Sequence, residues 1–429
     1  MDLRLNDAVV KVELSGIRQF TYLVRDTPGA CALTIGEPDL NTPDAIKEAA
    51  KAALDDNDTH YPPGNGYPYL LEEISKFEAQ AHGLHYAPNE IIMTVGATEA
   101  LFASFSTILN AGDEVIIPTP AFGLYEALVQ LRQGVPVSLP TEDNHFQIDP
   151  EALRAAITPR TKAIILTSPN NPTGCMYSKE TLDAIHDVLK DKPIFVLCDD
   201  VYRTLVYKEG YHSFAEYQDM RDRIIVINSF SKPYAMTGWR LGYCMADAPI
   251  MDRIQVFHQY AVTSVPAFVQ KACVTALHTP TDDVVEIFRK RRADGYGPGG
   301  GRAHGGVLHV HQYPEVRHGL PDLLPPDAAG GPGGRYPRHL LRYGGVYAPF
   351  LLLLRRGPER GPGPDREVHQ EPVKTAKKRC AAGTALFHSF GVRIALDVFC
   401  FYGPAISSSE TAVPLTVTIS MPLLAPRTS

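Results

Sequence analysis

The sequence predicts an α/β protein whose mostly parallel sheet is covered by helices on both faces. Between about residues 85 and 245, apolar segments of strand length alternate with amphipathic segments of helix length. The strand-like segments are apolar throughout, as strands buried on both faces are. Their helical connections allow neighbouring strands to run in the same direction. These observations together predict a doubly wound sheet.

Six segments are predicted as strands because they are short, rich in Ile and Val, and bounded by polar residues. They are, in chain order, NEIIMTV (89–95), DEVIIPT (113–119), KAIILTS (162–168), PIFVLCD (193–199), RIIVINS (223–229) and LGYCMAD (241–247). Helices are predicted for ALFASFSTIL (100–109) and SKETLDAIHDVLK (178–190), which lie between strands. In such sheets a ligand binds beyond the carboxyl ends of the strands.

The residues that follow the predicted strands are small and polar, as a ligand site at that edge requires. They are Gly96, Ala97 and Thr98 after the first strand, and SPNNPTG, DDVY and SFSK after the third, fourth and fifth.

Composition excludes several classes of function. The formal net charge is -7 with both signs interspersed, so no basic stripe is available for nucleic acid. The N-terminal segment has no apolar core of a signal peptide, and no run of about 18 apolar residues predicts a membrane span. The seven cysteines form no C-x-x-C pair. We therefore expect a cytoplasmic protein without a metal site.

The composition changes abruptly near residue 293. Residues 293–373 contain no Ser, Thr, Asn, Ile, Met, Lys, Cys or Trp. A Pro/Gly linker would normally contain Ser, Thr and Lys. Asn, Ile, Lys, Met and Thr all have codons that begin with adenine, so a one-base shift in a GC-rich gene explains the pattern. The hypothesis is that the chain from about residue 293 is translated out of frame and is poorly ordered.

Lys232 follows two closely spaced serines, in SFSKPYAMTGWRLGY (229–243). A lone lysine after a strand is usually a solvated surface charge. Here Ser229, Ser231 and Arg240 supply hydroxyl and guanidinium donors that suit a phosphate. A lysine amine beside a phosphate site is what a Schiff base with pyridoxal 5'-phosphate needs.

Several motifs together resemble the class I/II aminotransferases, which are fold-type I pyridoxal-phosphate enzymes. In chain order they are LTIGEPDLNTP, YPPGNGYPYLLEEI, TVGATEAL, PTPAFGLY, SPNNPTG, CDDVYRTLVY and SFSKPYAMTGWRLGY. The resemblance covers roughly residues 8–292 and is strongest to bacterial aspartate-type and N-acetyl-diaminopimelate aminotransferases. It implies an N-terminal segment (1–35) contributing to a small domain, a large cofactor-binding domain (36–285), and an incomplete small domain (286–429).

The resemblance assigns the central chemistry to three residues. Lys232 would hold the cofactor as an internal aldimine and act in turn as nucleophile and general base. Asp199 would pair with the pyridine nitrogen, although an isolated Asp there could be a helix N-cap. Tyr202, with Asn171, would hydrogen-bond the cofactor's ring oxygen. Asn171 could otherwise be only a turn residue.

The remaining assignments concern the phosphate, the ring face, the substrate and a second subunit. The amides of Gly96, Ala97 and Thr98 would bind phosphate at a helix N-terminus, with Ser229, Ser231 and Arg240. Phe122 would stack on the ring, unless it is a core aromatic. Gly36 and Asn171 would contact substrate, and Gly36 could otherwise be a turn glycine. Tyr61, unless a simple surface residue, would reach the neighbouring subunit's phosphate, which implies a homodimer.

One expected part is missing. The family binds the substrate's α-carboxylate with an arginine in an R-[IL]-S motif, and the sequence contains no such motif. The resemblance implies transamination between an acidic or related α-amino acid and a 2-oxo acid such as 2-oxoglutarate. Two alternatives stay open: a lyase on the same scaffold, and an inactive cofactor-binding remnant that lacks the arginine.

Overall fold

The computed structural model describes residues 3–13, 30–31, 36–207, 210–294, 353–354, 394–398 and 415–419. The chain divides into two compact units, the first comprising Met1–Glu13 and Gly36–Ala348 and the second Leu14–Ile35 and Pro349–Ser429. The segment with the predicted frame shift lies almost entirely outside the described residues. The predicted boundaries 1–35, 36–285 and 286–429 therefore stay predictions.

In its described residues, the second unit contains two short antiparallel strand pairs. They are β1 (Ala30–Cys31) with β9 (Leu353–Leu354), and β10 (Ile394–Val398) with β11 (Leu415–Ile419).

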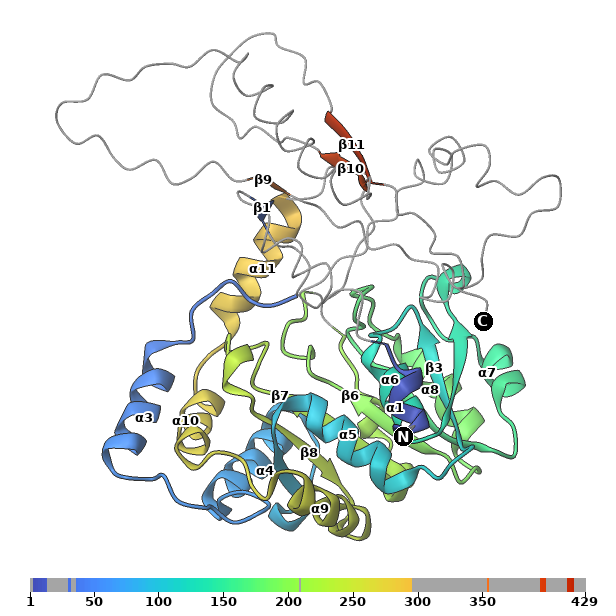
Figure 1. Ribbon diagram of the computed structural model, residues 1–429. Coiled ribbons are helices and arrows are strands. Elements are labelled where there is room, and N and C mark those ends of the chain that lie inside the picture. The colour runs from blue at the N-terminus through green and yellow to red at the C-terminus, as the bar shows by residue number, and fades with distance from the viewer. Residues whose placement is uncertain are drawn as a thin grey trace, which may run out of the picture. The chain divides into compact units, whose positions relative to one another are not determined.

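The first unit is built on a seven-stranded sheet (Figure 1). In spatial order its strands are β2 (Ile91–Thr94), β8 (Gly242–Ala246), β7 (Ile224–Ser229), β6 (Phe195–Asp199), β5 (Thr161–Thr167), β3 (Glu114–Thr119) and β4 (Val135–Pro140). The pairs from β7 to β4 are all parallel, whereas β8 is antiparallel to both of its neighbours. The predicted mostly parallel α/β sheet is confirmed.

Alternate residues of each strand pack on opposite faces of the sheet, which makes a three-layer structure. In β7, Ile224 and Val226 belong to one apolar cluster, and Ile225 and Ile227 belong to the other. Because both faces are buried, a continuous apolar run is what such a strand requires.

Helices cover both faces. The first cluster is completed by α3 (Asp44–Asp55), α4 (Pro68–His82), α7 (Pro150–Ala156), α8 (Lys179–Leu189) and α10 (Ala267–Leu277). The second is completed by α5 (Gly96–Ile108), α6 (Leu124–Leu131) and α9 (Ala248–Val262). Two further described helices are α1 (Asp7–Lys11) and α11 (Asp282–Asp294).

Two details of the sheet differ from the sequence prediction. The segment LGYCMAD forms β8, which runs against the other strands, because the connection from β7 holds only the short helix η5 (Thr237–Trp239) and no crossover helix. Strand β4 was not predicted. It is an outermost strand of the sheet, contains two prolines and has only one buried residue, so it lacks the apolar run of a central strand.

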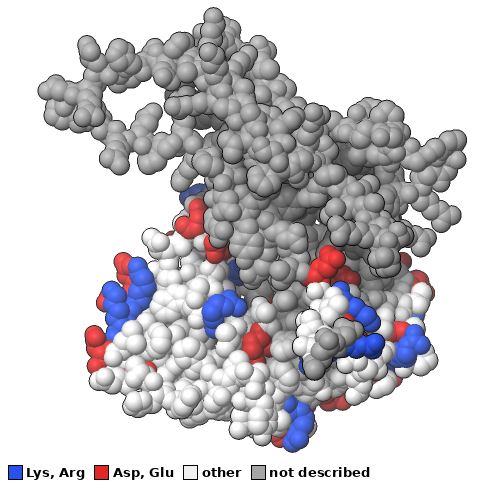
Figure 2. Space-filling model, viewed as in Figure 1, with Lys and Arg blue, Asp and Glu red and all other residues white. Residues whose placement is uncertain are grey.

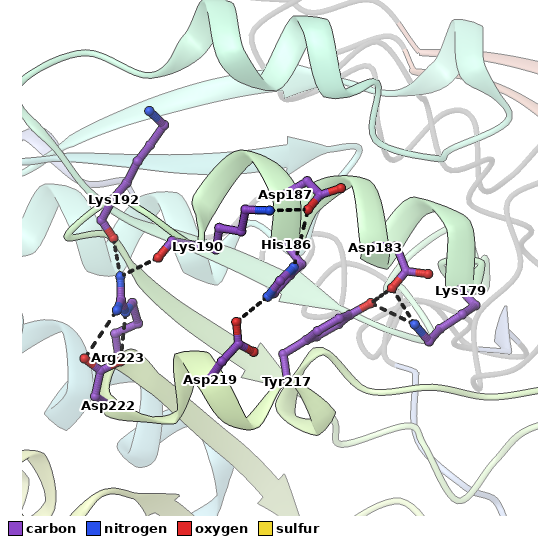
Figure 3. Close-up of polar contacts among 10 residues, drawn as sticks. All are labelled: Lys179, Asp183, His186, Asp187, Lys190, Lys192, Tyr217, Asp219, Asp222 and Arg223. Atoms are coloured by element: carbon purple, nitrogen blue, oxygen red, sulfur yellow. Dashed lines mark hydrogen bonds and ion pairs between the residues drawn. The ribbon is translucent and has the colours of Figure 1, made fainter.

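A surface network joins α8 to η4 (Gln218–Arg223), the short helix that leads into β7 (Figure 3). His186 stacks on Tyr217 with ring centroids 4.6 Å apart, and its Nε2 lies 2.7 Å from Asp219 Oδ2. The Tyr217 hydroxyl donates to Asp183 Oδ1 at 2.6 Å. These contacts fix the entry to β7, whose far end carries residues of the candidate site.

The visible surface of the described part carries Lys, Arg, Asp and Glu in mixed small groups, with broad uncharged areas between them (Figure 2). Among the described helices, none combines the length and apolar character needed to cross a membrane.

Candidate functional site

The carboxyl ends of β2, β6 and β7 bring the predicted residues together at one edge of the sheet. Ser229 ends β7 and Thr94 ends β2, and both pair with Gly242, the first residue of β8. Asp199 ends β6, next to β7. Register therefore places the loops around Gly96, Arg240 and Ser229 beside one another.

Gly96, Ala97 and Thr98 form the first turn of α5, as predicted. Gly96 has a φ of +72°, and a Cβ built on it would lie 2.8 Å from Arg240 Nη2. A Cβ on Gly242 would lie 2.9 Å from the Ala97 nitrogen, so the start of α5 packs directly on β8. Val95, the N-cap of α5, gives the first turn no side-chain hydrogen bond. Amides at such a helix start are donors suited to an anion.

Arg240 lies against this helix start, and Ser229 pairs with Gly242, on which the helix start packs. Arg240 is exposed and adopts a left-handed φ of +59°, which is uncommon for a residue with a side chain. Its Nη1 donates to the Thr237 carbonyl oxygen at 3.1 Å, which directs the guanidinium toward Gly96. The Ser229 hydroxyl accepts from the Ser231 amide at 3.1 Å. The Ser229 hydroxyl donates in turn to the Leu241 carbonyl oxygen at 3.1 Å. The α5 amides and the Arg240 guanidinium are donors that would suit the predicted cradle for a dianion such as phosphate.

Lys232 lies beside Gly36 and Tyr202. Its Nζ donates to the Gly36 carbonyl oxygen and lies 5.7 Å from the centroid of the Tyr202 ring. Burial lowers the pKa of Lys232, Glu37 opposes this change, and Arg240 adds to it. A lowered pKa increases the fraction of neutral amine, which is the nucleophilic form.

Asp199 is buried with one oxygen unpaired. Its Oδ2 accepts from the Tyr125 hydroxyl at 2.6 Å, whereas Oδ1 has no hydrogen-bond partner among the described residues. Burial raises the pKa of Asp199 to about 6, and the hydrogen bond from Tyr125 opposes the rise. A buried carboxylate oxygen without a partner is costly, so its position suits a ligand that presents an N–H group.

Sequence reasoning did not find Tyr125, whose hydroxyl also lies 2.8 Å from Thr167 Oγ1. The only available signal was its place in PAFGLY, three residues after Phe122. The Phe122 ring is 39% exposed and meets the Tyr125 ring edge-on, with centroids 5.9 Å apart. Phe122 is therefore not a core aromatic, and its ring stands next to the tyrosine that holds Asp199.

The loop after β5 carries two neighbouring asparagines, Asn170 and Asn171. Asn170 Oδ1 accepts from the Thr173 amide and hydroxyl at 3.2 and 3.0 Å, so Asn170 holds the turn. Asn171 is half-buried in the same loop. The role of Asn171 toward the cofactor stays a prediction.

Among the described residues, no hydrogen bond or ring contact joins Tyr61 to the other predicted site residues. Its side chain is 90% exposed. An aromatic ring in this state is available to a second molecule.

Comparison with known proteins supplies the family. Residues 30–293 match the family described as aminotransferase class I and II. The putative aminotransferase YugH of Bacillus subtilis is 41% identical over 293 residues, which cover 67% of this chain and 76% of that protein. The probable N-acetyl-LL-diaminopimelate aminotransferase of the same organism is 40% identical, covering 68% of this chain and 75% of that protein.

Comparison with solved structures leads to the same family. Thermus thermophilus aspartate aminotransferase with maleate is 34% identical and superposes with a TM-score of 0.65, over 68% of this chain and 79% of that one. The family match over residues 30–293 includes the sheet, the start of α5 and the loops that carry Asp199 and Lys232. The chain therefore belongs to the class I and II aminotransferases, which are pyridoxal-phosphate-dependent transferases of fold type I.

Proposed function

We propose that this chain transfers the amino group of an acidic or related α-amino acid to a 2-oxo acid such as 2-oxoglutarate, with pyridoxal 5'-phosphate bound covalently by Lys232. The observation that carries the proposal is the pairing of two groups in one site. The half-buried Lys232 has a lowered pKa and its Nζ lies 5.7 Å from the centroid of the Tyr202 ring. The buried Asp199, which lies in the same turn as Tyr202, has one oxygen without a hydrogen-bond partner among the described residues.

The residues fit the cofactor part by part. Its phosphate suits the amides of Gly96–Thr98 with Ser229, Ser231 and Arg240. Asp199 Oδ1 suits the N–H of the pyridine ring, and Lys232 Nζ suits the aldehyde. Asn171 and Tyr202 supply polar groups for the ring oxygen. The exposed Phe122 ring supplies an aromatic face for stacking.

The chain's own groups then perform the proton chemistry. When bound, the cofactor supplies an electron-accepting ring that stabilises negative charge at the substrate's Cα. Asp199, held by Tyr125, keeps a negative charge at the ring nitrogen. Lys232 removes and returns the proton at Cα, and its lowered pKa suits a base that works near neutral pH.

Similar proteins support the acidic substrate class. Relatives from Geobacillus stearothermophilus and Pyrococcus horikoshii are named aspartate aminotransferases, and the Thermus thermophilus enzyme was solved with maleate, a dicarboxylate. Gly36, whose carbonyl oxygen contacts Lys232, and Asn171 are proposed to border the substrate.

The direct test is a half-reaction with the full 429-residue chain. The chain is mixed with pyridoxal 5'-phosphate, L-glutamate or L-aspartate is added, and the visible absorbance of the bound cofactor is followed. Conversion to the amino form supports transamination. Continued release of product beyond one molecule per chain, without any 2-oxo acid to take up the amino group, would instead indicate a lyase. Cofactor attachment without conversion by either amino acid would indicate the remnant that lacks its carboxylate-binding arginine.

The phosphate cradle gives a separate prediction. Gly96→Ala is expected to weaken binding of pyridoxal 5'-phosphate by about tenfold or more, because the added Cβ displaces Arg240. Gly83→Ala is the matched control. Gly83 also has a positive φ, +67°, but a Cβ there meets nothing within 4 Å. Both variants carry a backbone cost of about 1–2 kcal/mol. Equal affinities in a fluorescence titration would contradict the cradle.

We also propose that the frame shifts near residue 293. The family match ends at that residue, where the composition changes. Sequencing the gene across codons 285–300 is expected to show one missing or extra base relative to the frame of the relatives. An uninterrupted frame would contradict this proposal.

A homodimer and a cytoplasmic location complete the proposal. The 90% exposure of Tyr61 supports a role toward a second copy, and sedimentation equilibrium is expected to give twice the chain mass. A monomer that binds the cofactor with full affinity would contradict this. Cys175, Cys198, Cys244 and Cys273 are free thiols, which favours a reducing compartment.

A further inference from the structure

The turn after β6 carries some residues that face the candidate site and others that are buried behind it. Asp199 and Tyr202 belong to the candidate site, whereas Asp200 and Arg203 are buried in a separate polar cluster. The side chains of Arg203 and its partner Glu78, from α4, are 1% and 0% exposed. Glu78 is thus a carboxylate in the middle of a helix that otherwise buries Leu70, Leu71 and Ile74.

A chain of hydrogen bonds runs from this ion pair to the other loop of the site. Glu78 Oε1 accepts from Arg203 Nη2 and from the Tyr243 hydroxyl. The Tyr243 oxygen accepts from Asn228 Nδ2 at 3.1 Å. Asn228 Oδ1 accepts from the Ser229 amide at 2.8 Å. The network therefore connects the Tyr202 turn to the residue that begins the SFSK loop.

A second branch holds the Tyr202 turn itself. The Arg203 amide donates to the Asp200 carbonyl oxygen at 3.0 Å, and Arg203 Nη1 lies 4.0 Å from Asp200 Oδ2. That carboxylate oxygen accepts from the Ser213 hydroxyl at 2.7 Å. Both ends of the turn are thus attached to groups behind the site.

Stability alone does not explain a fully buried ion pair. Removing two charges from water costs free energy that their attraction repays only with excellent geometry, so apolar residues of similar volume are often as stable. Here the hydrogen-bonding groups of the pair are only partly satisfied. Glu78 Oε2 and Arg203 Nε and Nη1 have no hydrogen-bond partner among the described residues. What the polar pair supplies, and an apolar pair cannot, is a fixed direction for the groups bonded to it.

We propose that Glu78 and Arg203 are positioning residues that orient both cofactor-binding loops from behind, the Asp199–Tyr202 turn and the Ser229–Lys232 loop. This inference rests on the proposed function, because it requires that these loops bind pyridoxal 5'-phosphate. Neither residue touches the reacting atoms.

The main test is the double variant Glu78→Leu with Arg203→Met in the full-length chain. Removing both charges together leaves neither one buried and unpaired, so the variant is expected to unfold within a few degrees of the wild type. Its dissociation constant for pyridoxal 5'-phosphate is expected to rise about 10–100-fold, the usual effect of losing an outer-shell partner. The pH midpoint of the bound cofactor's visible absorbance is expected to move by more than about half a pH unit, because Asp199 and Tyr202 set it.

Amide hydrogen exchange measures the order of the two loops in the absence of cofactor. In the apo double variant, exchange is expected to be faster over residues 199–205 and 228–232 and unchanged in α5. The matched control is Glu114→Leu with Arg160→Met. This ion pair lies at the start of β3, at the amino ends of the strands and therefore away from the site. Its removal is expected to leave the cofactor affinity and the pH midpoint of the absorbance unchanged.

Tyr243→Phe provides a milder variant should the double variant fail to fold. It removes only the hydroxyl that joins Glu78 to Asn228, and is expected to weaken cofactor binding about fivefold, as loss of one hydrogen bond would. The positioning role would be overturned, with the proposed function intact, if both variants fold and keep the wild-type cofactor affinity and absorbance midpoint. If the double variant does not fold, the same result in Tyr243→Phe alone would overturn it. Failure of the wild type to attach the cofactor at Lys232 would overturn both.

Discussion

Lys232→Ala is expected to abolish covalent attachment of pyridoxal 5'-phosphate and to slow the half-reaction with L-glutamate by about 10⁴-fold, the upper range for loss of a general base. The structure gives the reason. Lys232 Nζ is the amine that lies between the Gly36 carbonyl oxygen and the Tyr202 ring, and its pKa is lowered by burial. Alanine supplies neither a nucleophile nor a base at that position.

Borohydride reduction followed by peptide mass spectrometry measures the attachment directly. The wild type is expected to carry the cofactor mass on the peptide that contains Lys232, and the variant on none. Lys162→Ala is the control. Lys162 packs on Phe195 at the amino ends of β5 and β6, whereas the site lies at the carboxyl ends of the strands. A labelled peptide elsewhere in the Lys232→Ala chain would show that another lysine is the attachment point.

Asp199→Asn is expected to reduce the half-reaction rate by about 10²–10³-fold, comparable to the loss of one preorganised electrostatic partner. Asparagine preserves the shape and can still contact Tyr125, but it carries no negative charge to hold a proton on the ring nitrogen. The rate is measured by stopped-flow absorbance with saturating cofactor. Asp219→Asn, in the surface network of Figure 3, is the control for loss of a carboxylate. A wild-type rate in the Asp199 variant would remove Asp199 from the mechanism.

The pH dependence of cofactor binding tests the same residue. Since burial raises the pKa of Asp199 to about 6, its ionised fraction falls as the pH drops below that value. Binding requires the ionised form, so wild-type affinity is expected to weaken from pH 7 to pH 5. The cofactor's phosphate also titrates near pH 6, as phosphate monoesters do, but it does so equally for both proteins. The dependence is therefore expected to be shallower in Asp199→Asn, and identical slopes would contradict the assignment.

Local patterns in the sequence were sufficient for the sheet and for the loops of the site. Continuous apolar runs such as RIIVINS indicate strands buried on both faces, and parallel strands bring their carboxyl ends to one edge. That rule alone predicted that Gly96, Asp199 and Ser229 would lie near one another. It could not reveal the edge strand β4, where two prolines and exposure replace the apolar run, or the reversed direction of β8.

The groups behind the site required the tertiary structure. Nothing in the spacing of Glu78, Arg203 and Tyr243 indicates that they meet, because they are separated by up to 165 positions along the chain. Tyr125 likewise reaches Asp199 across 74 positions. Contacts of this kind depend on which strands are neighbours and on their register, and a one-residue change of register would turn Tyr243 to the other face of the sheet.

The sequence by itself therefore determined the α/β class and predicted the loops of the candidate site and its lysine, since each depends on residue types within a few positions. Only the tertiary structure decided which oxygen of Asp199 is left unpaired, how Lys232 is buried and which side chains hold the two loops from behind. The physical reason is that burial and hydrogen-bond partners are properties of the packed chain, supplied by segments that are distant in sequence.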